Sequence, residues 1–200
     1  MRKYSPESGD PYLDPNTGIF RNLIGATTED RLELLEGTLV SARGYELALD
    51  PEPGAFDLAH LQRIHRRLFQ DVYDWAGQLR VVEITKGSTI FARRDVIEQA
   101  AGTLFCQLAQ EHHLRGLDPA RFSARAGYFF GEINVLHPFR DGNGRAQRAF
   151  VGQLAEANGY KVDWDTMTGE DVVRASIAAY NGDPTAMAQL IENSLSGLER

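Results

Sequence analysis

The chain has 200 residues, of which 42% are hydrophobic and 24% are charged, and its formal net charge at pH 7 is −7. This length suits one good hydrophobic core, because single domains cluster at roughly 100 to 200 residues. The acidic balance argues against proteins that bind nucleic acid through a broad basic face. No apolar run approaches the roughly 18 residues that a membrane span needs, and the first ten residues do not resemble a secretory signal. We therefore expect neither direct nucleic-acid binding nor membrane binding.

The first 27 residues are expected to form an extended arm, because proline and glycine recur too often for a helix. Residues 28–200 are expected to form one domain. It begins with a predicted helix over residues 28–49, for which Thr27 and Asp30 provide a start similar to a capping box. The expected buried face of this helix consists of Leu32, Leu35, Leu39 and Ala42. The sequence PEPG then ends the helix.

A second helix is predicted to begin at Asp57, which is a good N-cap residue. Its expected apolar face consists of Leu58, Leu61, Ile64 and Leu68. The segment DVYDWAG follows, and we expect its Tyr73 and Trp75 to anchor a turn.

Residues 79–92, LRVVEITKGSTIFA, predict a short β-hairpin with a turn at Lys86 and Gly87. The arms of this hairpin are expected to contain Val81, Val82, Ile84 and Thr85 before the turn and Thr89, Ile90 and Phe91 after it. We expect no other strand pair. Helical periodicity returns over five segments, which are residues 95–112, 119–136, 143–158, 169–180 and 184–195. The predicted fold class is mainly α, with six to eight helices and one hairpin.

The chain contains one cysteine, Cys106, within the apolar pattern of Leu104, Phe105 and Leu108. A lone cysteine in such a pattern is typical of a packed small hydrophobic residue, and it cannot form an intramolecular disulfide. We therefore expect Cys106 to be buried and the protein to be cytoplasmic. Export by a route without a leader sequence is the alternative.

Residues 137–148, HPFRDGNGRAQR, interrupt what would otherwise be two helices with apolar faces. The simplest interpretation is a turn between helices, with Pro138 and Gly142 as helix breakers and some solvated charge. The combination of residue types favours a functional site instead. Pro138 moves His137 out of helical conformation, and Phe139 is expected to hold the loop against the core.

The rest of this segment is suited to a phosphate group. Asp141 is a hard oxygen ligand of the kind that binds Mg²⁺ together with substrate phosphates. Gly142 and Gly144 allow close backbone approach at the start of a helix, where N–H groups favour an anion. Arg145 and Arg148 share one helical face and can each hold a phosphate. The segment therefore predicts a site for phosphate transfer.

The other nucleotide and metal motifs do not explain this prediction. The sequence GxxxxGK[ST] is absent, and GNGRAQ lacks the third glycine and the strand of a dinucleotide fingerprint. The remaining histidines do not have the spacing of a zinc site, and we expect them to be surface or packing residues. These are His60, His65, His112 and His113.

The segment matches every fixed position of the Fic signature, HxFx(D/E)GNGRxxR, so the chain resembles a Fic-domain protein adenylyltransferase. The resemblance covers residues 30–195 and extends to IHRRLFQDVYDWAGQLR, which looks like the helix leading into the family's flap. The predicted hairpin looks like the flap itself. The resemblance implies the Fic fold and the transfer of AMP from ATP to a hydroxyl side chain of a target protein.

The resemblance also implies a role for each matching residue. His137 would be the general base for the target hydroxyl as it attacks the α phosphate, and Asp141 would bind Mg²⁺. Arg145 and Arg148 would bind the β and γ phosphates. The anion nest would consist of Gly142, Asn143 and Gly144, with the Asn143 side chain also on phosphate.

The flap would dock the target by main-chain pairing and would place a tyrosine, threonine or serine over His137. Its residues are Ile84, Thr85, Lys86, Gly87, Ser88, Thr89 and Ile90. A hairpin that only covers the core is the alternative. Gly144 stands where a phosphorylating branch of the family has lysine, which favours AMP transfer over phosphorylation, and phosphocholine or UMP transfer are further alternatives. Tyr180 and Asn181 are candidates for the adenine pocket, or else a plain helix end.

Many Fic proteins restrain themselves with a helix of the form (S/T)xxxE(G/N). Leu32 precedes Glu36 and Ala188 precedes Glu192, so neither possible motif has the hydroxyl. The resemblance therefore implies a class I toxin that a separate small antitoxin holds inactive through a glutamate paired with Arg148. Bacterial relatives of this class adenylylate type II topoisomerases, which implies DNA gyrase or topoisomerase IV as the target. A degraded Fic module that binds nucleotide or protein, or a phosphohydrolase that removes AMP, are the alternatives.

Overall fold

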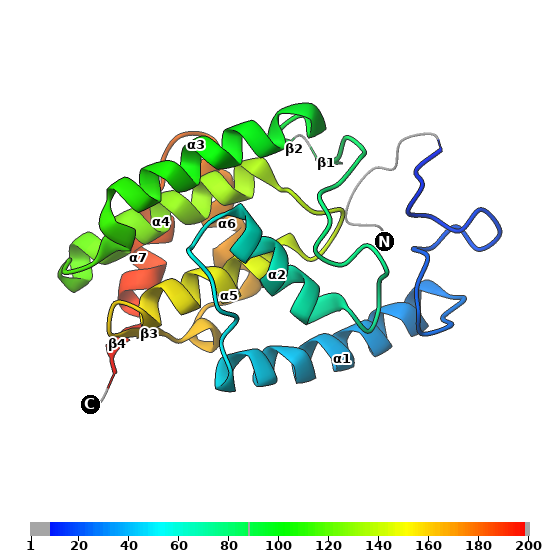
Figure 1. Cartoon of the computed structure of the whole chain (residues 1–200), viewed down its shortest axis with the longest axis horizontal. Helices are drawn as coiled ribbons and strands as arrows, with labels where there is room; N and C mark the ends of the chain where they lie inside the picture. Colours follow the sequence, from blue (N-terminus) through cyan, green and yellow to red (C-terminus); the bar gives the residue numbers. More distant parts are fainter. Residues whose placement is uncertain (1–8, 88, 199–200) are drawn as a thin grey trace.

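A computed structural model describes residues 9–87 and 89–198 of the chain, and its helices confirm the mainly α fold class (Figure 1). Within these residues there are seven α-helices. They are α1 (Glu29–Leu49), α2 (Leu58–Phe69), α3 (Ile97–Gln110), α4 (Pro119–Leu136), α5 (Asn143–Glu156), α6 (Gly169–Tyr180) and α7 (Thr185–Asn193). Short 3-10 turns occupy Arg94–Val96, His112–Leu114 and Trp164–Thr166.

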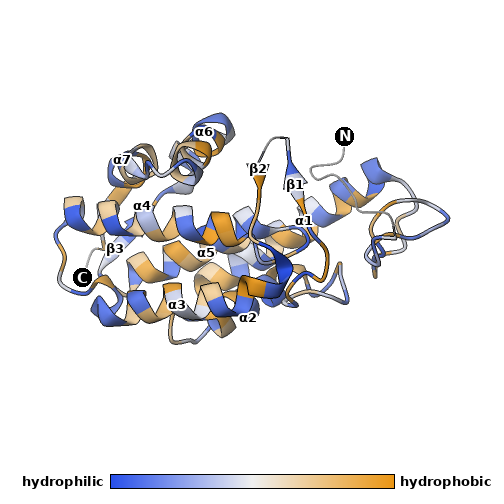
Figure 2. Cartoon of the chain, turned by 90° about the horizontal axis from the view of Figure 1, so that it is seen from above, coloured by the Kyte–Doolittle hydropathy of each residue, from blue (hydrophilic) through white to orange (hydrophobic). Residues whose placement is uncertain are grey.

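Helix α4 organises the bundle, because it contacts α3, α5, α6 and α7. Seen from above, α6 and α7 lie on one side of α4, and α5, α3 and α2 lie on the other (Figure 2). Helix α1 lies along the outside of the bundle and packs on α2, which in turn packs on α5. The core is rich in phenylalanine, and six of the described rings are at most 2% exposed. They are Phe69, Phe122, Phe129, Phe130, Phe139 and Phe150.

Capping side chains account for where α1, α2, α4 and α6 begin. Asp57 accepts a hydrogen bond from the His60 N–H at the start of α2, as predicted, and Thr168 plays the same part for α6. Helix α1 is capped by Thr28 and not by Thr27. Its predicted buried face is also partly wrong, because Ala42 is exposed and Glu36, Val40 and Leu47 are buried instead.

The predicted hairpin is confirmed but very short. Strand β1 (Thr85–Lys86) pairs antiparallel with β2 (Thr89–Ile90), with Thr85 opposite Ile90. Val81 and Val82 precede the strand, and Ser88 lies outside the described residues.

The expectation of a single strand pair is wrong. Strand β3 (Tyr160–Val162) pairs antiparallel with β4 (Leu195–Gly197), so Leu195 belongs to a strand and not to the end of the last helix. The two strands are too short for a period of two to be visible in the sequence. They lie near the C-terminus, at the lower left of Figure 1 and away from the hairpin.

Residues 10–27, all within the described part, contain no helix and pack against the bundle. Tyr12 and Ala26 are buried, and the Asp10 carboxylate forms a buried ion pair with Arg140, at 2.7 Å. This segment is therefore attached to the loop that follows α4.

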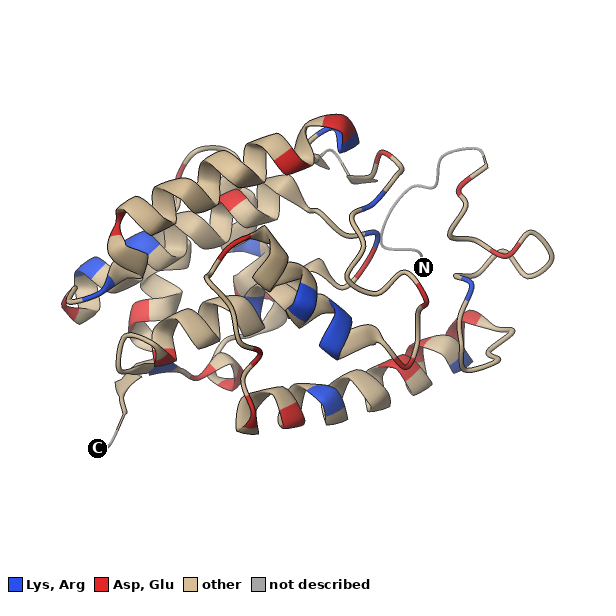
Figure 3. Ribbon diagram, viewed as in Figure 1, with Lys and Arg blue, Asp and Glu red and all other residues tan. Residues whose placement is uncertain are grey.

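Polar surface features follow from the same packing. Basic side chains gather on α2, with acidic side chains on α1 and on the connection between the two helices (Figure 3). Arg67 pairs with Asp50, and Arg43 pairs with Asp71.

The expectation that Cys106 is buried is wrong. Two residues along a helix correspond to about 200°, so Cys106 faces away from the buried Leu104 and Leu108. Within the described residues, no helix combines the length and the apolar character that crossing a bilayer requires.

Candidate active site

The loop between α4 and α5 is held in a left-handed turn at both of its ends. His137 ends α4 with φ 43° and ψ 60°, and Gly142 precedes α5 with φ 78°. Phe139 is fully buried between them, as the sequence predicted. The Asn143 side chain closes the loop, because its Oδ1 accepts from the Phe139 N–H at 2.9 Å and its Nδ2 donates to the Phe139 carbonyl at 2.8 Å. These contacts occupy the side chain for which the resemblance implies a phosphate contact.

The His137 ring is fixed on two sides. It stacks on Phe91 with 3.7 Å between ring centroids, and its Nδ1 lies 3.2 Å from the Asn134 carbonyl oxygen. A carbonyl only accepts, so Nδ1 carries the proton and Nε2 carries the lone pair. Burial lowers the pKa of His137 to about 3, which keeps the imidazole neutral at physiological pH. A neutral imidazole of this tautomer is suited to accept a proton.

The start of α5 presents N–H groups to an anion. The N–H groups of Asn143 and Gly144 donate to none of the residues that the structure describes. The first turn of a helix concentrates such donors and the positive end of the helix dipole. Asp141 lies next to them and accepts from the Gly142 N–H at 2.5 Å. The start of α5 therefore offers N–H donors beside a carboxylate, and their role as an anion nest stays a prediction.

The two arginines of the motif have different surroundings. The Arg145 guanidinium lies 2.7 Å from Glu36 Oε1 and stacks over the Phe69 ring at 4.5 Å. Tyr73 donates to the other oxygen of the same carboxylate. Arg148 forms no hydrogen bond or ion pair with any described residue, although burial lowers its pKa from the ordinary value. A half-buried guanidinium that forms no ion pair within the described part of the chain is suited to an anionic ligand.

A cavity of about 660 Å³ brings the predicted site residues together. All seven predicted catalytic, phosphate and metal residues of the motif line it, and so do Lys86, Gly87 and Thr89 of the flap. Its far wall consists of Val172, Val173, Ser176, Ile177 and Tyr180 from α6. The sequence identified only Tyr180 of this wall, because the other four are ordinary positions of an amphipathic helix. Asn181 ends α6 and does not line the cavity.

His65, which the sequence predicts to be a surface or packing residue, supports the motif loop. Its ring lies between Phe69 and Phe139, with centroids 4.6 and 3.9 Å away. Nδ1 accepts from the Gly77 N–H at 2.9 Å, so Nε2 donates to the Asp141 carbonyl, also at 2.9 Å. Burial lowers its pKa to about 4. Its place in the segment IHRRLFQDVYDWAGQLR was the available signal.

Replacing Gly142 or Gly144 of the motif with alanine is expected to have different effects on stability and on nucleotide affinity. A Cβ on Gly142 would lie 2.4 Å from the Phe69 ring and would also be strained by the positive φ, so we expect a loss of stability of about 2 kcal/mol or more. A Cβ on Gly144 meets nothing within 4 Å, so the melting temperature should change little. Because Gly144 lines the cavity, the added methyl group should hinder close approach of a phosphate, and the nucleotide Kd should rise. Thermal unfolding and nucleotide titration of both variants check this. Equal melting temperatures of the two variants would contradict it.

Comparisons with known proteins agree with this geometry. The model of the Fic/DOC family matches residues 55–155. The chain is 48% identical over 196 residues to protein adenylyltransferase VbhT of Bartonella schoenbuchensis, covering 98% of this chain but 41% of VbhT. It is also 40% identical over 190 residues to a protein of Escherichia coli K12 named probable protein adenylyltransferase Fic, covering 95% of this chain and 94% of that protein.

Solved structures are similar over nearly the whole chain. BepC of Bartonella tribocorum with bound AMPPNP has a TM-score of 0.87 and 28% identity, covering 95% of this chain and 98% of that one. The N-terminal Fic domain of a Bartonella quintana effector with bound ADP has a TM-score of 0.86 and 30% identity, covering 94% and 96%. Adenine nucleotides are therefore bound in two proteins of this fold.

Proposed function

Because the chain belongs to the Fic/DOC family, we propose that it transfers the AMP part of ATP to a hydroxyl side chain of a target protein. The observation that carries the proposal is one cavity that joins the neutral His137 ring, the start of α5 and both motif arginines. Two relatives that the chain matches over 94% and 96% of their length are named probable protein adenylyltransferases, which supports the same reaction class. The chain spans 41% of the length of VbhT, so VbhT as a whole is a larger protein.

In the proposed reaction the target oxygen attacks the α phosphorus, and His137 takes the proton of the hydroxyl through Nε2. The bond from the α phosphorus to the bridging oxygen breaks, and pyrophosphate leaves. Arg145 and Arg148 would neutralise the β and γ phosphates, and the N–H groups of Asn143 and Gly144 would bind phosphate oxygens. Positioning and charge neutralisation supply most of the rate in reactions of this kind.

A Mg²⁺ ion fits this site when the substrate supplies most of its ligands. The described residues contain no group of three or more His, Cys, Asp or Glu side chains that could hold a metal by themselves. Asp141 is one carboxylate on the cavity wall next to an anion site, which is how Mg²⁺ is commonly held together with phosphates. Bound there, the ion would neutralise charge on the phosphates. The role of Asp141 would be to fix its place.

The apolar wall of α6 is the proposed contact of the adenine base. Val172, Ile177 and Tyr180 offer the apolar and aromatic surface that ligand pockets use for flat rings. The Tyr180 hydroxyl also donates to the Ile90 carbonyl of the flap at 2.8 Å. The base would then lie between the flap and α6, away from the phosphates.

The expected result for this function is label from the α position of ATP on a protein band. The purified chain is incubated with Mg²⁺, a bacterial lysate and ATP labelled at either the α or the γ position. Label from α alone supports AMP transfer, and the band identifies the target, for which DNA gyrase and topoisomerase IV are the proposed candidates. Label from γ would indicate phosphorylation. No label from either would reduce the chain to a binding module, and release of AMP from a labelled protein would indicate a phosphohydrolase.

Control by a separate antitoxin is a further part of the proposal. Glu36 is paired with Arg145, whereas Arg148 forms no hydrogen bond or ion pair with any described residue, and the Asp165 carboxylate acts on it only from beyond ion-pair distance. Arg148 and Arg145 also line a second cavity of about 440 Å³ between α1 and α5, through which a partner's glutamate could reach Arg148. In the same labelling experiment the chain without its partner should therefore be active. A fully inactive free chain that binds ATP would contradict this regulation.

A further inference from the structure

The flap is too small to hold its own position. Each of its strands has two residues, and a two-stranded hairpin is marginally stable at best in water. Lys86 and Ile90 are exposed. The flap is anchored at its base, where Ile84 is 3% exposed and Phe91 is 6% exposed.

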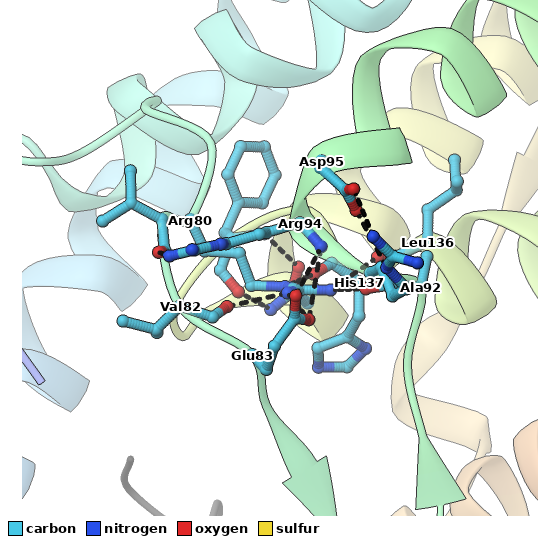
Figure 4. Close-up of polar contacts among 12 residues, drawn as sticks. Arg80, Val82, Glu83, Ala92, Arg94, Asp95, Leu136 and His137 are labelled. Atoms are coloured by element: carbon cyan, nitrogen blue, oxygen red, sulfur yellow. Dashed lines mark hydrogen bonds and ion pairs between the residues drawn. The ribbon is translucent and has the colours of Figure 1, made fainter. Parts of the chain in front are cut away.

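One buried guanidinium connects both ends of the flap to His137 (Figure 4). Nε of Arg80 donates to the His137 carbonyl at 2.9 Å. One terminal nitrogen donates to the Val82 carbonyl before β1 at 2.8 Å, and the other donates to the Ala92 carbonyl after β2. Three separate stretches of backbone therefore meet at a single side chain, which is itself fully buried.

Neighbouring contacts extend the same connection. The Arg80 N–H donates to the Pro138 carbonyl at 2.9 Å, and the Ala92 N–H donates to the Val135 carbonyl at 3.0 Å. The Glu83 carboxylate accepts from Arg80 at 3.4 Å and from the Arg94 N–H at 3.2 Å. Both arms of the hairpin are thus attached at their bases to the backbone around His137.

These contacts need the geometry of arginine. The planar guanidinium presents five N–H donors in fixed directions, whereas a lysine ammonium is a compact charge that cannot reach carbonyls on several sides at once. Arg80 is not among the residues that line the 660 Å³ cavity, so its charge is used on the protein backbone and not on a phosphate.

We infer that Arg80 is a positioning residue that fixes the flap relative to His137 and so sets where a docked target side chain lies against the general base. The inference rests on the proposed function, in which the flap docks the target. A displacement of about 1 Å from productive geometry can cost about 10²-fold in rate, so a loosened flap base should impair use of the target. The nucleotide, which is held by α5 and the motif arginines, should be affected far less.

The test replaces Arg80 with lysine and compares the variant with Arg125→Lys, which alters a two-donor pair with Glu111 far from the flap. Hydrogen exchange of the amides of residues 84–91 should be at least about tenfold faster in Arg80→Lys and unchanged in Arg125→Lys. The lysate concentration that half-saturates labelling of the target band should rise at least about tenfold, with the KM for ATP within about twofold of the unaltered chain. Equal losses in the use of target and of ATP, or unchanged flap exchange, would overturn the inference.

The two proposals can fail separately. If the unaltered chain labels no protein, AMP transfer is wrong, and the exchange measurement alone then decides the role of Arg80. If Arg80→Lys does not fold, Glu83→Ala takes its place. The Glu83 side chain is 41% exposed, and its carboxylate accepts from Arg80 and from the Arg94 N–H at the base of the flap. Glu83→Ala should also speed flap exchange. Unchanged exchange in that variant would overturn the inference as well.

Discussion

Replacing His137 with alanine is expected to reduce AMP transfer by about 10² to 10⁴, which is the usual contribution of a general base. The imidazole is neutral, its Nδ1–H is directed to the Asn134 carbonyl, and its ring is held against Phe91. Alanine removes the proton acceptor and leaves the start of α5 and both arginines in place. The variant should therefore bind ATP with nearly unchanged affinity, which separates loss of chemistry from loss of binding. The measurements are the rate of α label onto the target band and the Kd for ATP.

The pH dependence of the unaltered chain tests the same residue. An ordinary histidine, with a pKa of about 6.5, would lose its base form as the pH falls from 7.5 to 5.5. Burial lowers the pKa of His137 to about 3, so its base form stays fully populated over that range. The pH profile of kcat/KM reports the ionisation of groups in the free enzyme. Between pH 5.5 and 7.5 it should therefore show no fall that is due to protonation of His137. A tenfold fall in kcat/KM centred near pH 6.5, while the chain stays folded over the same pH range, would contradict the buried neutral base.

His112→Asn is the control for the His137→Ala variant. His112 is exposed, lies beyond the end of α3 and has a positive φ, which asparagine tolerates. Its activity should match that of the unaltered chain. If His137→Ala retained more than about a tenth of the activity while His112→Asn retained all of it, another group would have to be the base.

The elements that the sequence predicted well are those whose signals are local. Helices α2, α4 and α6 begin where an Asp or Thr caps the first turn, and the predicted starts agree with the structure. The β3–β4 pair was missed because its three-residue strands are joined by hydrogen bonds between segments far apart in the sequence. The expectation for Cys106 is wrong because nearness in sequence to Leu104 and Leu108 is not nearness on the helix, where two residues are about 200° apart.

The site divides in the same way. The residues that line the cavity from the motif follow one another in the sequence, so their chemistry could be recognised together. The residues that hold the motif in place could not. Arg80, His65 and Asp10 are buried polar residues whose partners come from distant segments, and a single polar residue in a sequence carries no mark of its partner. The motif could therefore be recognised from the sequence, whereas the residues that support it were visible only in three dimensions.

Asp10→Ala is expected to cause the largest loss of stability, about 3 to 5 kcal/mol, because it removes the buried carboxylate that accepts two hydrogen bonds from the buried Arg140 guanidinium. Arg140 lies inside the motif loop with its side chain 2% exposed, and it donates to Asp10 Oδ2 from Nε at 3.0 Å and from a terminal nitrogen at 2.7 Å. The guanidinium also stacks over Phe20 at 4.8 Å. For a chain of this size the loss corresponds to a fall in Tm of about 10 °C. Thermal or denaturant unfolding measures it.

Asp95→Ala is the matched control, since Asp95 also pairs with an arginine, Arg93, but both side chains are more than half exposed. An exposed pair contributes about 0 to 1 kcal/mol, so the Tm of Asp95→Ala should differ by a few degrees at most from that of the unaltered chain.

The double variant Asp10→Leu with Arg140→Met should recover much of the lost stability, because an apolar pair can replace a buried ion pair at little cost. If Asp10→Ala and Asp95→Ala lowered Tm equally, the segment before α1 would not be anchored through Arg140. If the double variant were stable but slow in AMP transfer, Arg140 would be needed to shape the loop that carries His137, beyond its share in stability.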